Sequence, residues 1–403
     1  MELRAGYKRT ETEAIPREWA VKRLGDIASL CKERVDPQAD GTSGFCVELE
    51  HVEPGTGQLM GNTSVDSQAS TKAVFRTGDV LFGKLRAYLR KYWLADREGV
   101  CSTEFWVLAA NRQMVIPEFL FYLVTTEEFI NMASMAYGTH MPRSDWNLAK
   151  NYRLALPGLE EQRAIASALS DVDALISSLD KLIAKKRDIK QAAMQQLLTG
   201  RRRLPGFKCT MERVRLGNIA QIVGGGTPRT GVAEYWDGEI RWCTPSDITA
   251  CRGKYLAETT SNITYQGLKS SAAQLLPPGT LLLCSRATVG EVRIAATEIC
   301  TNQGFKSLVC GDRVNNEYLY YAIPMMKPRM VEKASGSTFL ELSKKDAESL
   351  ELYLPPFDEQ VAIASVFSDM DAEIEALERR RYKTRLLKQG MMQELLTGRV
   401  RLV

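Results

Sequence analysis

The chain contains a long internal repeat, and this repeat constrains its fold more than any other feature. Residues 160–204 align without a gap with residues 358–402, at an offset of 198 positions, and 25 of the 45 aligned residues are identical. Self-similarity on this scale indicates a chain built from two copies of one structural plan.

Each copy of the repeat is predicted to form one long helix. Pro157 and Pro355 precede the two copies, and Gly200 and Gly398 follow them, as is typical of helix boundaries. At 1.5 Å per residue, a helix over 160–198 would be about 58 Å long. Apolar residues recur in alternating steps of four and three, which predicts the seam of a helix pair. The seam residues are Ile165, Leu169, Val172, Ile176, Leu179 and Ile183 in the first copy, and Ile363, Phe367, Met370, Ile374 and Leu377 in the second.

Charge patterning favours antiparallel pairing of the two helices. The first half of each copy is acidic, whereas residues 181–203 and 379–401 each carry eight Lys or Arg and one acid. Antiparallel packing places acidic beside basic halves, and parallel packing would place like charges together. The alternative is two separate amphipathic helices, each lying on its own domain.

The segments outside the helices also resemble one another. VKRLGDIASL (21–30) matches RVRLGNIAQI (213–222), and TGDVLFGKLR (77–86) matches PGTLLLCSRA (278–287). Short apolar runs broken by Gly and Pro predict strands, irregular loops and some helix. We therefore expect an α+β protein with two mixed α/β domains separated by two long antiparallel helices. The predicted boundaries are 1–156 for the first domain, 157–205 for the first helix, 206–354 for the second domain and 355–403 for the second helix.

Composition excludes several classes of protein. The 403 residues carry a net charge of only +4, so the location of the charge matters more than its sum. The nine cysteines form no CxxC, and the only histidines are His51 and His140, which argues against disulfide frameworks and metal sites. The N-terminus is polar and no apolar run could span a bilayer, so we expect a cytoplasmic protein that is not bound to a membrane.

We find no constellation of residues that would support catalysis. GDVLFGKL (78–85) matches a phosphate-binding loop except that Leu85 stands where Ser or Thr should hold magnesium. LPPF (354–357) resembles the tetrad of an adenine methyltransferase, but Leu354 replaces its polar residue. With two histidines far apart in sequence, a histidine-based triad has little to draw on. The sequence predicts no catalytic residues and no cofactor, so any chemistry would belong to partners.

The repeated helices carry a specific family resemblance. LPGLEEQRAIA (156–166) and LPPFDEQVAIA (354–364), with LLTGR at both helix ends, resemble the conserved regions of the specificity subunit of type I restriction–modification systems. GGGTPRT (224–230), SRATVG (285–290), TNQGF (301–305) and GSTF (336–339) resemble its target-recognition domains. The first domain departs from these forms, since FGKLRAY and STEF replace SRATVG and TNQGF.

This resemblance implies a reader of DNA without catalytic activity. One specificity subunit would join two methylation subunits, which bind S-adenosylmethionine, and ATP-driven restriction subunits in systems that contain them. Each target-recognition domain would read one half of a bipartite, asymmetric site in double-stranded DNA. The two helices would act as a spacer between the domains and a dock for the methylation subunits.

Polar and cationic loop residues are the candidates for DNA contacts, because such side chains reach base edges and phosphates. In the first domain the candidates are Lys84, Arg86, Arg90, Lys91, His140 and Arg143. In the second domain they are Thr227, Arg229, Arg286, Thr288, Asn302, Gln303, Lys306 and Thr338. For each of them, a role in fixing its own loop or a solvated surface position is the alternative.

Two other functions are alternatives to a DNA-recognition subunit without catalytic activity. The first is a self-sufficient DNA enzyme, either a methyltransferase or a nuclease; the sequence lacks the tetrad and the cofactor loop that a methyltransferase would need. A coiled-coil scaffold that binds only protein would share the helices but show no preference between specific and random duplexes.

Overall fold

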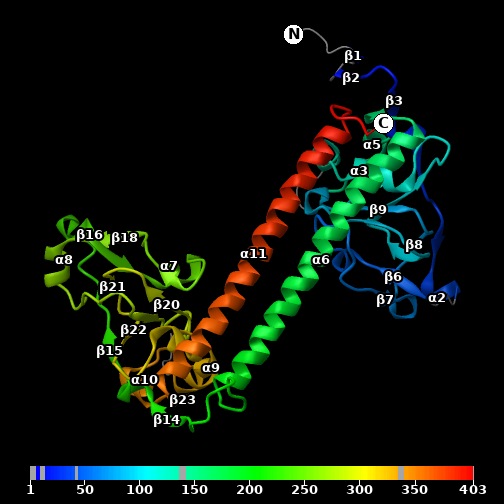
Figure 1. Ribbon diagram of the computed structural model, residues 1–403. Helices are drawn as coiled ribbons and strands as arrows, with labels where there is room; N and C mark the ends of the chain where they lie inside the picture. Colours follow the sequence, from blue (N-terminus) through cyan, green and yellow to red (C-terminus); the bar gives the residue numbers. More distant parts are fainter. Residues whose placement is uncertain (1–5, 10–13, 41–43, 136–141, 335–339, 403) are drawn as a thin grey trace. The chain divides into compact units, whose positions relative to one another are not determined.

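The computed structural model describes residues 6–9, 14–40, 44–135, 142–334 and 340–402, which form two compact units (Figure 1). The first unit comprises residues 1–180 and 380–403, and the second comprises residues 181–379. His140 and Thr338 lie outside the described residues.

The first unit contains two main sheets. One has the strand order β10-β9-β12-β4 and the other β5-β8-β11-β6-β7, in which β11 is parallel to β6. Two further pairs, β1-β2 and β13-β3, are antiparallel. The strands are β1 (Tyr7–Arg9), β2 (Ala14–Pro16), β3 (Ala20–Arg23), β4 (Ala28–Leu30), β5 (Arg34–Val35), β6 (Phe45–Val47), β7 (Thr63–Ser64), β8 (Lys72–Phe75), β9 (Val80–Gly83), β10 (Tyr92–Leu94), β11 (Gly99–Ser102), β12 (Phe105–Ala110) and β13 (Arg153–Leu156).

The second unit repeats this plan with one strand more in the first sheet and two fewer in the second. Its main sheets have the orders β15-β22-β19-β20-β17 and β18-β16-β21, with β21 parallel to β16, and β14 pairs with β23. The strands are β14 (Glu212–Arg215), β15 (Ala220–Gly224), β16 (Trp236–Cys243), β17 (Tyr255–Leu256), β18 (Ser261–Ile263), β19 (Leu281–Leu283), β20 (Val292–Ala295), β21 (Cys300–Thr301), β22 (Lys306–Cys310) and β23 (Glu351–Leu354).

Short helices follow the strands of both units, and two helices are far longer than the rest. The short α-helices are α1 (Leu24–Ile27), α2 (Pro37–Asp40), α3 (Pro117–Val124), α4 (Glu127–Ser134), α5 (Trp146–Ala149), α7 (Pro245–Ala250), α8 (Tyr265–Lys269), α9 (Asn316–Lys333) and α10 (Lys344–Ser349), and the 3-10 helices are η1 (Leu49–His51), η2 (Val65–Ser67), η3 (Ala87–Leu89), η4 (Leu216–Asn218) and η5 (Ala233–Tyr235). The long helices are α6 (Leu159–Leu197) and α11 (Phe357–Leu395), so the prediction of two long helices is confirmed. None of the helices within the described ranges is long and apolar enough to cross a membrane.

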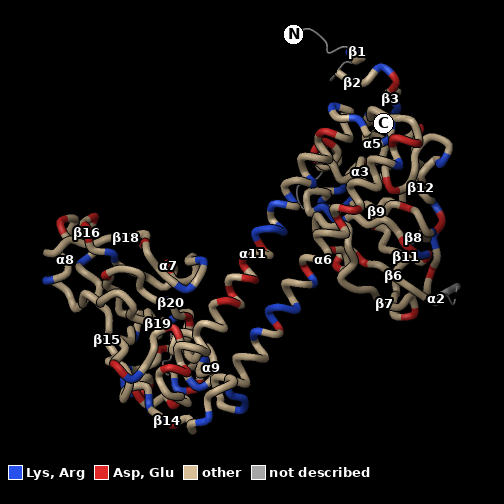
Figure 2. The backbone as a smooth tube through the Cα atoms, in the orientation of Figure 1, with Lys and Arg blue, Asp and Glu red and all other residues tan. Residues whose placement is uncertain are grey.

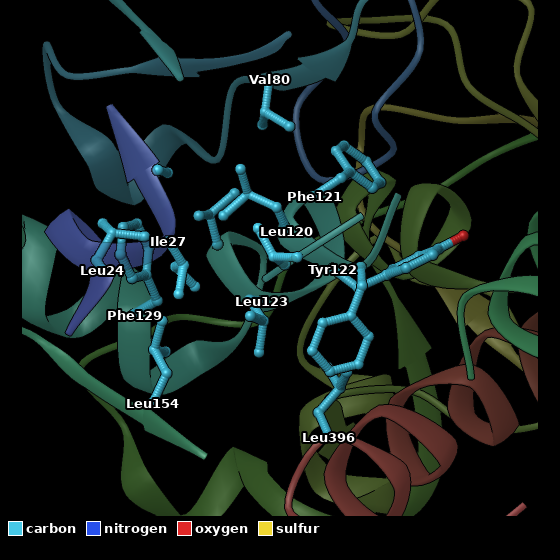
Figure 3. Close-up of a cluster of buried hydrophobic side chains, with 14 of the residues drawn as sticks. Leu24, Ile27, Val80, Leu120, Phe121, Tyr122, Leu123, Phe129, Leu154 and Leu396 are labelled. Atoms are coloured by element: carbon cyan, nitrogen blue, oxygen red, sulfur yellow. The ribbon is translucent and has the colours of Figure 1, made fainter. Parts of the chain in front are cut away.

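The ends of the long helices belong to the domain cores. In the first unit, Ile165 and Leu169 of α6 pack with Leu395 and Leu396, which come from the LLTG end of the other copy. Figure 3 shows Leu396 in this cluster among side chains of α3 and its neighbours. The equivalent cluster of the second unit contains Leu197, Leu198, Ile363 and Phe367. Each domain therefore buries the start of one long helix and the end of the other.

Ion pairs within each unit join the acidic half of one helix to the basic half of the other. In the first unit, Asp173 pairs with Lys388 at 2.6 Å and Asp180 pairs with Arg381 at 2.7 Å. Figure 2 marks the acidic residues of both helices in red and the basic residues in blue. In the second unit the pairs are Lys186 with Glu373, Arg187 with Glu378 and Lys190 with Asp371. The predicted antiparallel pairing is confirmed.

Most of the predicted seam residues are buried. Ile165, Leu169, Ile176, Leu179, Ile183, Ile363, Phe367 and Ile374 are fully or nearly fully buried, and Val172, Met370 and Leu377 are half-buried. The burial is greatest near the start of each helix, because these turns lie in a domain core as well as beside the other helix.

Candidate nucleic-acid interface

An arginine that follows one helix binds the glutamate that begins the other, in both units. Arg203 donates two hydrogen bonds to the buried carboxylate of Glu359, one of them 2.7 Å long. Arg401 does the same to Glu161, which also accepts a 2.9 Å hydrogen bond from the indole of Trp19. These pairs explain why the repeat keeps Glu near its start and Arg near its end.

The glutamine beside each of these glutamates ties its helix to the domain. Gln162 accepts a hydrogen bond from the backbone of Ile116 at 3.0 Å and donates to the carbonyls of Met114 and Pro157. Its equivalent, Gln360, accepts from Asn315 and donates to the carbonyls of Arg313 and Pro355. The Glu-Gln motif of the repeat is therefore structural, since one residue clamps the helix pair and the next holds the domain.

A third contact is also repeated. The hydroxyl of Tyr122 donates to Asp173 at 3.0 Å, and Lys388 lies over the Tyr122 ring. In the second unit, Tyr321 donates to Asp371 at 2.8 Å and Lys190 lies over its ring. These contacts orient each domain on its own part of the helix pair.

The loops that carry most of the DNA candidates share one backbone frame in the two domains. The N–H of Ser144 donates to the carbonyl of Lys84 at 2.9 Å, and the N–H of Leu342 donates to the carbonyl of Ser285 at 3.0 Å. The residue two positions after each of these acceptors has a left-handed backbone, with φ 54° at Arg86 and φ 57° at Ala287. The two domains thus present different side chains from the same scaffold.

In the first domain these paired segments, which we call the loop edge, carry Lys84, Arg86 and Arg143 together with one acid. The guanidinium of Arg143 forms hydrogen bonds of 2.8 and 2.9 Å with Glu104, on the turn between β11 and β12. Arg143 lowers the pKa of this carboxyl below its usual range. Arg86 is exposed, and burial lowers the pKa of Lys84.

Two other candidates of the first domain are engaged elsewhere. Arg90 holds Glu127 with two hydrogen bonds of 2.5 and 2.6 Å, and Lys91 donates to the carbonyl of Leu49 at 2.7 Å. Both side chains fix the loop that carries them to neighbouring elements. Their assignment as DNA contacts stays a prediction.

In the second domain the equivalent edge has an acid where the first domain has Arg143. Glu341 stands at the position of Arg143, 198 residues later, and pairs with Arg286 at 2.6 Å and with Lys306 at 3.1 Å. Burial opposes ionisation of Glu341, but hydrogen bonds from the two cations outweigh it and lower its pKa. The structure therefore brings Arg286 and Lys306 together through an acid.

The polar candidates of the second domain lie beside this group. Thr227 donates to Gln303, and the side chain of Asn302 accepts a 2.8 Å hydrogen bond from the N–H of Gly304. Asn302 thus fixes its own turn, while Gln303 is exposed. Arg229 is exposed after β15, and Thr288 is half-buried in the loop after β19.

Sequence reasoning missed the acids that hold these loops. Glu104 and Glu341 bind the candidate cations and so decide how much positive charge each edge offers. The repeat contained the signal for one of them, because the offset of 198 aligns Arg143 with Glu341. The repeat could not predict that Arg143 binds Glu104, because Glu104 lies on a turn 39 residues earlier in the chain.

The first unit also contains a cavity whose lining includes several charged side chains. This cavity of about 600 Å³ is lined by α3, α4, β13 and the long helices, and it contains several carboxylates. Three of the acids in its lining, Glu127, Asp173 and Asp180, are each bound to a cation or a tyrosine. Among the described residues, no group of His, Cys, Asp and Glu side chains could hold a metal ion.

The protein family described as the type I restriction modification DNA specificity domain matches this chain twice, over residues 16–186 and 209–384. Among similar proteins is the putative type I restriction enzyme MjaX specificity subunit of Methanocaldococcus jannaschii, which is 26% identical over 98% of this chain and 96% of its own length. The MjaIX specificity subunit of the same organism is 38% identical, over 40% of this chain and 38% of its own length.

Solved structures agree with these sequence matches. A chain described under complex assembly and conformational transition of the type I R-M system has a TM-score of 0.64 and 25% identity, and the match covers 96% of this chain and 99% of that one. The HsdS subunit from Thermoanaerobacter tengcongensis has a TM-score of 0.50 and 25% identity, with coverages of 97% and 99%.

Proposed function

Because the chain belongs to the family of type I restriction–modification DNA specificity subunits, we propose that it reads a bipartite, asymmetric site in double-stranded DNA. Residues 1–156 would read one half of the site and residues 206–354 the other. The observation that carries this proposal is the pair of equivalent loop edges with different side chains. A shared frame with different side chains, such as Arg143 in one domain and Glu341 in the other, fits two readers of different sequences.

The catalytic partners in this proposal are two methylation subunits that bind S-adenosylmethionine, with ATP-driven restriction subunits where a system contains them. Apolar side chains on the long helices support docking there. Leu182 and Ile189 of α6, and Tyr382, Leu386 and Leu387 of α11, are exposed, whereas Ile183 of the seam, next to Leu182, is buried. Exposed apolar residues in a row along a helix are typical of a surface that receives another helix.

The first test asks whether the two domains read independently. The chain is expressed with its methylation subunit, and methylated adenines are mapped across the host genome. Replacement of residues 1–156 by the same domain of a relative should change one half of the methylated site and leave the other half unchanged. A change in both halves would contradict independent reading.

The same expression system separates the alternative functions. Methyl transfer by the purified chain without its partner would identify a self-sufficient methyltransferase. The complex can also be tested on random duplexes and on duplexes that carry the mapped site. Equal affinity for both at physiological salt would favour a scaffold that binds only protein.

A further inference from the structure

The loop between β9 and β10 of the first domain exposes two large apolar side chains to solvent. Tyr88 is 54% exposed and Leu89 is 41% exposed, at the tip of η3. Ala87, the residue before them, is buried in the domain core and anchors the loop. Two adjacent exposed apolar residues on a loop tip are a feature that needs a reason.

The loop is held by its backbone at both ends. Arg86 and Arg90, on either side of η3, have left-handed backbones with φ 54°. The N–H of Arg86 donates to the carbonyl of Pro142 at 2.9 Å, and the carbonyl of Arg90 accepts from Gly55 at 2.8 Å. Non-glycine residues adopt this conformation rarely, and it persists where the surrounding structure holds it.

The side chain of Arg90 adds a further restraint. Its bidentate contact with Glu127 ties the loop to the first turn of α4. The backbone of Tyr88 and Leu89 is therefore held in place by the residues on either side of them.

The second domain shows that the scaffold itself does not require exposed apolar residues here. Its loop between β19 and β20 starts from the same frame, with a left-handed backbone at Ala287. At its tip, Val289 is only 8% exposed and Gly290 follows it. Tyr88 and Leu89 are thus specific to the first domain.

We propose that Tyr88 and Leu89 form a wedge that presses on a base step of DNA within or beside the first half-site. This inference rests on the proposed function, and it adds a shape-dependent contact to reading by polar groups. Apolar wedges partly unstack a base step, and an aromatic ring can stack on the exposed base face.

The surrounding charge favours DNA as the occupant of this tip. Arg86 is exposed next to the wedge, and Arg143 and Lys84 lie at the same loop edge. The nearby acids, Glu104 and Glu127, are each bound by an arginine. The edge therefore offers cations to phosphates around an apolar tip.

The test uses the complete complex with methylation subunits and duplexes that carry 2-aminopurine. The probe replaces single bases around the first half-site, except the methylated adenines, because base flipping would also raise its fluorescence. In the wild-type complex, fluorescence should rise at one base step. Tyr88→Ala and Leu89→Ala should abolish this rise and weaken binding to the site about tenfold.

Conservative and remote variants serve as controls. Tyr88→Phe and Leu89→Met keep the apolar bulk and should retain the rise in fluorescence. Met60→Ala removes another exposed apolar side chain of the same domain and should change nothing.

Two results would overturn the wedge. One is site binding and fluorescence in Tyr88→Ala and Leu89→Ala equal to those of the wild type. The other is loss of the methylation subunit from these variants, seen by native mass spectrometry, which would make the tip a protein contact. A wild-type complex without site-specific binding would instead refute the proposed function, and the wedge with it.

Discussion

The two units of this protein agree closely where they hold the helix pair and differ where they face outward. Three contacts are nearly the same in both units. They are made by the glutamates Glu161 and Glu359, by the glutamines Gln162 and Gln360, and by the tyrosines that donate to Asp173 and Asp371. At the loop edges, by contrast, the same backbone frame carries Arg143 in one domain and Glu341 in the other, and the loop tips differ. The comparison indicates that assembly constrains the repeated positions, whereas the varied positions are free to define a sequence.

The agreement at the helix ends is incomplete, and the difference is measurable. Glu161 has a second donor in Trp19, whereas the described hydrogen bonds to the Glu359 carboxylate come from Arg203. Without Arg401, the Glu161 carboxylate would keep the hydrogen bond from Trp19. Without Arg203, the Glu359 carboxylate would lose the hydrogen bonds described for it.

The largest expected effect therefore comes from Arg203→Ala. It should lower the free energy of unfolding of the second unit by about 3–5 kcal/mol, because it leaves the Glu359 charge buried without its partner. Arg401→Ala should cost less, about 1–3 kcal/mol, since Trp19 still donates to Glu161. Equilibrium urea unfolding gives the totals, and hydrogen-exchange mass spectrometry assigns them to a unit.

Arg201→Ala is the control, because this exposed arginine lies two residues before Arg203. Its effect on the free energy of unfolding should be small. If the Arg203→Ala and Arg401→Ala variants lost equal stability, the indole of Trp19 would contribute nothing to the difference between the units.

An intermediate effect is expected at the equivalent positions Arg143 and Glu341. Glu341→Gln should free Arg286 and Lys306, so that the assembled complex binds non-specific DNA several-fold more tightly. Arg143→Gln, at the equivalent position of the first domain, should weaken binding because it removes a cation and leaves Glu104 unbalanced. Affinities measured over a range of salt concentrations should show a steeper salt dependence for the first variant and a shallower one for the second.

Equal signs for the two variants would mean that one of these edges does not face DNA. A double variant, Glu341→Gln with Arg286→Gln, tests the cause, because removal of the freed arginine should return part of the affinity toward that of the wild type.

The repeated positions are also those that the sequence predicts best. A gapless repeat of 45 residues identifies two helices, and the separation of charge along them fixes their orientation. The roles of Glu161 and Arg401 were not predicted, although both residues are part of the repeat. Their contact joins residues 240 positions apart, and periodicity within one helix carries no information about such a partner.

The loop edges are less predictable for a related reason. Candidate residues were chosen by type, and type does not show whether a cation is already bound. Arg90 and Lys91 have the same chemistry as Arg86, yet they bind Glu127 and the Leu49 carbonyl. The exposure of Tyr88 depends on the backbone at Arg86 and Arg90, which no local pattern revealed.

Two buried aspartates extend the comparison to pH. Burial would raise the pKa of Asp247 in the second unit, but hydrogen bonds from Thr260 and Thr244 outweigh it and lower the pKa. Asp79 in the first unit is also buried, and burial raises its pKa because its hydrogen bond from the Arg76 backbone is too weak to compensate.

The smallest expected effect is the opposite pH dependence of these two sites. The stabilisation by ionised Asp247 is complete above its ordinary pKa of about 3.9 and is lost as pH falls through the lowered value. The cost of ionising buried Asp79 instead grows as pH rises from the ordinary pKa through the raised one. Asp247→Asn should therefore be more damaging at pH 7 than at pH 3, and Asp79→Asn less damaging at pH 7 than at pH 3. Urea unfolding of both variants at the two pH values measures this, and a parallel response would show that the hydrogen bonds from the two threonines do not offset the burial of Asp247.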